Sequence, residues 1–137
     1  MTDLFSAARA CLDAAMPDDK PALTLAMAEA FKRGELAIDA AIAAPEPIRM
    51  PGRPAKPKLV HPRELPRRGL GSDEGRAAFL HAIAHIELNA IDLGWDAVYR
   101  FRGLPADFYR DWVQVADDEA RHFVLLRDRL RALGYDY

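Results

Sequence analysis

Two long stretches of helical sequence, separated by a few residues, constrain the fold of this chain most strongly. The first begins after Ser72, a residue type that favours the N-cap position of a helix, and continues to about residue 101. Gly103 ends it, and Pro105 suits the first turn of a second helix that continues to about Leu133. Because so short a link joins helices that are neighbours in space, the sequence predicts an antiparallel helical hairpin.

Shorter helices are predicted before the hairpin. Residues 3–16 are rich in Ala and Leu, and a helix there ends before Pro17. Residues 20–43 form a second helical stretch, in which Gly34 is a point where the helix bends or breaks. Residues 1–44 are therefore expected to form an N-terminal helical segment.

A proline-rich segment connects these helices to the hairpin. Residues 45–71 hold seven of the ten prolines and many basic residues. Proline removes a backbone donor and disfavours helix in the residue before it, so we expect an irregular strap. Its basic charge is alternatively suited to a phosphate-bearing partner. No alternating apolar run reaches strand length, so the fold is predicted to be all-α, with the hairpin in residues 72–137.

Glu87 has an unusual position on the first long helix. At about 100° of rotation per residue, the apolar side chains of this helix lie within about 60° of Glu87. These residues are Leu80, Ile83, Ala84, Ala90, Ile91, Gly94 and Val98. A solvated glutamate is expected on the opposite face, so the pattern predicts that Glu87 points into the core.

The second long helix repeats this pattern. Glu119 lies at the centre of its apolar stripe, and His122 lies about 60° to one side. The other residues of the stripe are Phe108, Trp112, Val115, Leu126, Leu130 and Leu133. Arg110 and Arg121 point away from the stripe, so neither is positioned to neutralise these acids.

Buried carboxylates must be neutralised, paired or bound to a metal, because an isolated buried charge is very costly. Glu119 and His122 are three residues apart and share one helix face, so both can bind one metal centre. We therefore predict a metal site made of Glu87, Glu119 and His122, with a chance arrangement as the alternative. His85 is a weaker candidate ligand, because it lies on the opposite face, where a surface role is the alternative.

The run HAIAHIELNAIDLGWDAVYRF, followed by DEARHF, resembles a bacterial ferritin-like family of unassigned function in the di-iron carboxylate superfamily. The resemblance covers roughly residues 60–137. It implies a ferritin-like fold with Glu87, Glu119 and His122 as metal ligands. More distantly, the motifs are similar to di-iron oxygenases, including the tRNA-hydroxylating monooxygenase, and to rubrerythrin-like proteins.

A complete domain of this kind takes a Glu from each of two helices and a Glu-x-x-His pair from each of the other two. This sequence holds one such helix pair and therefore resembles only the N-terminal half. The second half is expected from a homodimer, whose two-fold symmetry would complete the ligand set, or from a missing C-terminal half. Alternatively, the N-terminal helices cover the apolar stripe and leave the site half-built.

Composition excludes several other classes of protein. The net charge of −2, from 19 basic and 21 acidic residues, lacks the basic excess of nucleic-acid-binding proteins, so we do not expect a nucleic-acid partner. Cys11 is the single cysteine, which excludes an internal disulfide and a cysteine-based metal cluster. No apolar run approaches the length of a membrane span, and the first residues do not resemble a signal peptide. We therefore expect a cytoplasmic protein without a membrane partner.

The function expected from these features is that of a di-metal oxidoreductase or oxygenase that acts with dioxygen or a peroxide. Carboxylate and imidazole ligands suit iron, with manganese or a mixed iron–manganese pair as alternatives. Two other functions stay open: a non-catalytic helical interaction module, and a metal-binding or storage protein. No feature of the sequence specifies a substrate.

Overall fold

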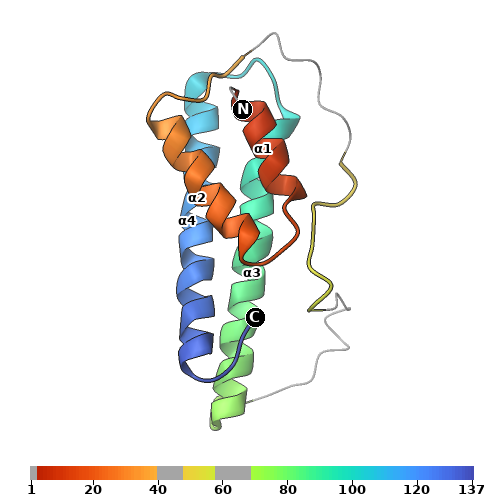
Figure 1. Ribbon diagram of the computed structural model, residues 1–137, viewed down its shortest axis with the longest axis vertical. Coiled ribbons are helices and arrows are strands. Elements are labelled where there is room, and N and C mark those ends of the chain that lie inside the picture. The colour runs from red at the N-terminus through yellow and green to blue at the C-terminus, as the bar shows by residue number, and fades with distance from the viewer. Residues whose placement is uncertain (1–2, 40–47, 58–68) are drawn as a thin grey trace.

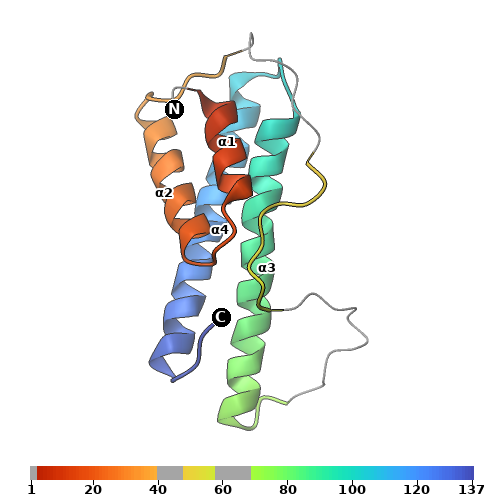
Figure 2. The same ribbon diagram turned by 45° about the vertical axis from the view of Figure 1, so that its right-hand side comes forward.

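The structure is a computed structural model that describes residues 3–39, 48–57 and 69–137. Four α-helices make up the named elements of these residues, so the fold is all-α, as predicted. The helices are α1 (Leu4–Asp13), α2 (Asp19–Lys32), α3 (Asp73–Arg100) and α4 (Ala106–Ala132). The long helices α3 and α4 run side by side as an antiparallel hairpin (Figure 1). Helices α1 and α2 lie on one side of this hairpin, along the half nearest the α3–α4 link (Figure 2).

Local signals define both ends of the hairpin helices. The Ser72 side chain accepts a hydrogen bond from the Gly75 N–H at 3.0 Å, which confirms the predicted N-cap of α3. Gly103 adopts a φ of 72°, a left-handed conformation that glycine tolerates without steric cost. Pro105 is the N-cap of α4 rather than a residue of its first turn. The predicted hairpin is therefore correct to within a residue or so at these ends.

The helical stretch predicted over 20–43 breaks at Gly34, the point indicated by the sequence. Helix α2 ends at Lys32, and Gly34 has a φ of 77°, so the chain turns there. After the turn the chain returns to the start of α1, where the Leu4 N–H donates to the Ala37 carbonyl at 2.8 Å. The prediction for residues 40–43 lies outside the described residues.

The predicted strap is described only in part. Residues 48–57 and 69–71 contain no helix or strand, in agreement with their proline content. The Gly52 N–H donates to the Leu12 carbonyl at 2.8 Å, which fastens the strap to the end of α1. The prediction for the rest of the strap, residues 45–47 and 58–68, lies outside the described residues.

One hydrophobic core takes side chains from all four helices. Helix α1 packs mainly on α3 and helix α2 mainly on α4. Trp95 of α3 is fully buried between them, and its indole N–H donates to the Thr24 hydroxyl of α2 at 3.0 Å. The fully buried side chains around it include Leu4, Phe5, Leu12, Ile91, Val98, Tyr109, Val113 and Phe123. No helix in the described residues is long and apolar enough to cross a membrane.

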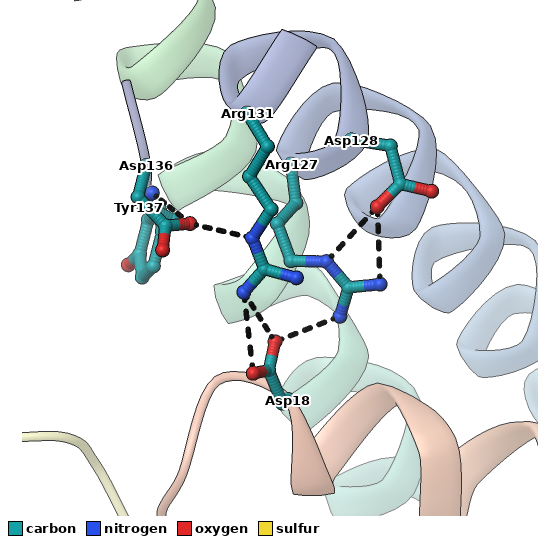
Figure 3. A network of polar contacts seen from close by, with 6 residues as sticks. All are labelled: Asp18, Arg127, Asp128, Arg131, Asp136 and Tyr137. Atoms are coloured by element: carbon teal, nitrogen blue, oxygen red, sulfur yellow. Dashed lines mark hydrogen bonds and ion pairs between the residues drawn. The ribbon is translucent and has the colours of Figure 1, made fainter. Parts of the chain in front are cut away.

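An exposed network also joins α2 to α4. Asp18, the N-cap residue of α2, accepts hydrogen bonds from Arg127 at 2.9 Å and from Arg131 at 3.0 Å (Figure 3). Arg131 also pairs with Asp136 at 2.9 Å, beyond the end of α4. These contacts place the start of α2 beside the last turns of the hairpin.

Candidate metal centre

Helices α3 and α4 approach each other closely in the half of the hairpin nearest their link. A methyl group on Gly94 of α3 would lie 3.0 Å from both the Cβ and the backbone nitrogen of Ala116 on α4. Such a distance leaves no room for a larger side chain at position 94. The close approach sets the spacing between Glu87, which lies two turns before Gly94, and the side chains of α4.

Glu87, Glu119 and His122 converge across this hairpin. One ligand atom from each side chain lies within 4.8 Å of the others. The His122 Nδ1 is 3.7 Å from Glu87 Oε2 and 3.5 Å from Glu119 Oε2. Among the described residues, this is the single group of three or more His, Cys, Asp or Glu side chains that lie close enough together to hold a metal ion. The structure thus brings together the three residues singled out from the sequence.

The cluster is more open than the sequence pattern predicted. The side chains of Glu87 and Glu119 are 20% and 23% exposed, and His122 is 53% exposed. The prediction that Glu87 and Glu119 point into the centre of a buried core was therefore wrong. The most buried side of α3 faces α1 and α2, at Leu88 and Trp95, about 80° to 100° around the helix from Glu87.

Cationic side chains are held away from the cluster. Arg121 pairs with Asp117 at 2.6 Å and with Asp118 at 2.9 Å, and Arg110 pairs with Asp107. In the part of the chain that the structure describes, His122 is the one basic group within ion-pair distance of Glu87 or Glu119. Two carboxylates therefore share one imidazole, and a divalent cation would balance their charge.

His85 lies apart from the cluster. Its Nδ1 is 2.7 Å from the Tyr137 hydroxyl, and the Tyr137 ring stacks on His81 with centroids 4.7 Å apart. Burial lowers the pKa of His85 below its ordinary value, and the nearby charges of Arg53 and His81 add to this effect. The contact with Tyr137 fits the alternative role for His85 better than that of a ligand to the Glu87 cluster.

A second buried polar cluster was missed in the sequence. The Lys20 ammonium donates to the Cys11 and Leu12 carbonyls at 2.9 and 3.0 Å, and to Asp92 at 2.5 Å. Lys20 is 1% exposed, which is rare for a lysine. Asp92 is also buried, although helix periodicity places it about 140° from Glu87 and its apolar stripe. The sequence contains little indication that Lys20 and Asp92 pair, because the two residues are 72 positions apart.

Asp117 is buried as well, although helix periodicity places it about 160° from the apolar stripe centred on Glu119. Its side chain is 4% exposed, because Lys32 of α2 reaches over α4 and pairs with it at 2.7 Å. Arg121 approaches the same carboxylate from the next turn of α4. The sequence pattern could not reveal this burial, because it arises from the packing of α2.

Comparison with known proteins identifies the family of this chain. Residues 13–137 match a family model described as "Protein of unknown function (DUF455)". The chain belongs to this family. The match confirms that the resemblance is to a family of unassigned function, whereas the ferritin-like part of the resemblance stays a prediction.

A relative of the DUF455 chain is found in Haemophilus influenzae, where it is described as an uncharacterized protein. The two sequences are 48% identical over 91 residues, which cover 61% of this chain and 32% of the relative. The chain thus spans about a third of the length of the curated relative it matches. No solved structure matches the chain.

Proposed function

We propose that this DUF455 chain carries half of a ferritin-like, carboxylate-bridged di-metal site. The observation that supports the proposal is the convergence of Glu87, Glu119 and His122 within 4.8 Å from two antiparallel helices. A lone Glu opposite a Glu-x-x-His pair is half of the ligand set of di-iron carboxylate bundles. In the proposed site, Glu87, Glu119 and His122 would hold the metals.

The donor atoms fit iron or manganese. Carboxylate oxygens and imidazole nitrogen suit these divalent ions, whereas the single cysteine, Cys11, is buried on the other side of α3 and takes no part. A pair of iron ions would supply redox chemistry toward dioxygen or a peroxide. We therefore propose an oxidoreductase or oxygenase with a di-iron cofactor, or with manganese or a mixed pair in the same ligands. A cytoplasmic location is part of the same proposal.

The protein's own contribution is to keep the two carboxylates spaced and free to bind. Asp117 and Asp118 hold the Arg121 guanidinium, which would otherwise compete with a metal for Glu119. The contact of Gly94 with Ala116 holds α3 and α4 at a fixed spacing. In addition, the His122 imidazole is 53% exposed, so it has room to turn toward a metal.

The proposed ligand set needs a second helix pair. Three protein ligands are fewer than the full bundle supplies, because a second Glu and a second Glu-x-x-His are expected. The second pair would come from a twin chain or from a further part of a longer polypeptide, such as the relative that is about three times the length matched here.

A second candidate function is a helical interaction module without redox turnover. It is favoured by large apolar side chains that remain exposed on the hairpin, among them Ile86 at 63% and Leu125 at 68%. Such a module would bind a partner whether or not metal is present. A storage function has less support, because nothing in the described residues forms a cage.

Anaerobic metal binding tests the proposal. The protein, equilibrated with Fe(II) or Mn(II) and freed of loose metal, should retain about one ion per chain, and Glu119→Ala and His122→Ala should lose it. Glu29→Ala, which removes an exposed glutamate of α2, is the matched control and should bind as the wild type does. Faster oxidation of Fe(II) by dioxygen in the wild type than in Glu119→Ala would support the redox role. Equal metal content in all four proteins would contradict the proposal.

A further inference from the structure

The end of α2 lies beside the start of α4 (Figure 1), and a cavity of about 530 Å³ lies between them. From α4 the cavity is lined by Ala106, Arg110 and Val113, which are about 120° to 180° around the helix from Glu119. Other lining residues belong to the last turn of α2 and to residues 34–38, which follow it. The cavity is therefore separate from the proposed metal site, and the proposed function does not use it.

The turn that ends α2 builds one wall of this cavity. The chain turns at Gly34, and the Leu4 N–H then donates to the Ala37 carbonyl at 2.8 Å, which ties the turn to the start of α1. Leu36 and Ile38, which flank Ala37, both line the cavity. Because this wall is fixed by a backbone hydrogen bond, it is formed before a ligand binds, and less ordering is required on binding.

The interior of the cavity is apolar. Its most buried lining side chains, Val113 and Leu36, are 1% and 6% exposed, and the half-buried Phe31 and Ile38 add further apolar surface. Small-molecule sites have volumes of roughly 300–1,000 Å³ and are lined mainly by apolar side chains with a few polar groups. The volume and the lining of this cavity therefore suit the apolar part of a small molecule.

The charged residues of the lining are both basic. They are Lys32 and Arg110, whose side chains are 41% and 63% exposed, and among the described residues that line the cavity none is acidic. Lys32 pairs with Asp117, which Arg121 also contacts, so Lys32 can bind a ligand without leaving that carboxylate unpaired. Arg110 pairs with Asp107, but both side chains are exposed, and such pairs contribute little stability. Both cations can therefore bind a negatively charged group at the mouth of the cavity.

We infer that this cavity binds a small amphipathic carboxylate, of the type of a medium-chain fatty acid. The apolar chain of the ligand lies against Phe31, Leu36 and Val113, and its carboxylate lies between Lys32 and Arg110. The planar guanidinium of arginine suits a carboxylate, because it can donate two parallel hydrogen bonds. A single negative charge suits these two cations, since each is already partly balanced by an aspartate. Binding does not depend on metal, because the cavity lies on the opposite face of α4 from Glu119.

Calorimetric titration of the full chain with octanoate, in the presence of chelator, tests the inference. 1-Octanol has the same chain without the charge, and acetate has the charge without the chain, so each should bind at least ~5-fold more weakly than octanoate. Lys32→Gln combined with Arg110→Gln should weaken octanoate binding by at least ~5-fold. Arg33→Gln is the matched control, because Arg33 is exposed and next to Lys32 but does not line the cavity. It should bind octanoate as the wild type does.

Ala106→Trp is a second test that leaves the charges in place. Ala106 is exposed and lines the cavity, so the indole should fill part of the cavity without disturbing the core, and octanoate binding should be lost. Ala132→Trp, at the exposed last residue of the same helix, is the control. No octanoate binding, or binding that survives both cavity variants, would overturn the site. Equally tight binding of 1-octanol would overturn the carboxylate class. Either failure would leave the proposed metal site standing, because metal binding is measured separately.

Discussion

The two sides of the α3–α4 hairpin both carry charged residues, but they balance the charge in different ways. On the side covered by α1 and α2, Lys20 and Asp92 form a buried ion pair at 2.5 Å, with side chains 1% and 9% exposed. On the open side, Glu87 and Glu119 share the single imidazole of His122. Among the described residues, no Lys or Arg lies within ion-pair distance of either carboxylate. A buried charge balanced within the chain fits a structural role, whereas an unbalanced pair of carboxylates fits a ligand site.

The covered side also satisfies its polar atoms more completely. The Lys20 ammonium has three acceptors, two of which are the last carbonyls of α1, so it caps that helix as well as neutralising Asp92. Burial raises the pKa of Asp92, and the charge of Lys20 opposes this shift. The contrast between the two sides can be tested by substitutions that should have very different effects on stability.

Lys20→Met should have the largest effect, a loss of about 3–5 kcal/mol in the free energy of unfolding, because it leaves the Asp92 charge buried and unpaired. Urea denaturation measures this loss. Lys20→Met combined with Asp92→Leu should recover part of it, since both charges are then absent. Lys32→Met is the control, because Asp117 keeps its pair with Arg121. A loss below about 1 kcal/mol for Lys20→Met would remove the basis for a structural role on this side.

Gly94→Val should have the next largest effect, a loss of about 1–3 kcal/mol, because the added methyl groups would force α3 away from Ala116. Ala82→Val, at an exposed position of the same helix, is the control and should cost less. Since the same contact spaces Glu87 from Glu119, Gly94→Val should also weaken metal binding. Unchanged stability together with unchanged metal binding would show that the helices do not need this close approach.

The hairpin could be predicted from sequence because its signals are local. Ser72, Gly103 and Pro105 lie at or beside the helix ends that they define, so α3 and α4 were found to within a residue or so. The convergence of Glu87 with the Glu119–His122 pair followed from helix periodicity and a short link. These inferences need only the chain near each residue and the geometry of an antiparallel pair.

The parts that could not be predicted depend on which helix covers which face. Periodicity gives the direction of each side chain but not the position of α1 and α2, so the burial of Glu87 and Glu119 was overestimated and that of Asp92 was missed. Lys20 and Asp92 are 72 residues apart, with no local signal that joins them. The end of α2 near Gly34 was indicated locally, whereas the return of the chain to α1 at Ala37 is a tertiary contact without a local signal.

Glu119→Gln should have a small effect on stability in the absence of metal, in contrast to Lys20→Met. It removes one of two like charges at a partly exposed site, so the free energy of unfolding should change by less than about 1 kcal/mol and toward greater stability. The same variant should lose metal binding. Urea denaturation in chelator measures the first effect. A loss comparable to that of Lys20→Met would show that both sides are structural and would remove the contrast between them.

The smallest effect concerns Cys11, which tests whether the covered side stays closed. Cys11 is fully buried beneath Lys20, and burial raises the pKa of its thiol to about 12. At about pH 8 the thiol is therefore protonated and inaccessible, and since the thiolate is the reactive form, a thiol reagent should not label the native chain. Labelling in urea gives the full signal for comparison. The open side should be unaffected by this closure, so metal binding should proceed while Cys11 stays unlabelled. Rapid labelling of the native chain would mean that α1 separates readily from α3, and the covered side would then be no more closed than the open one.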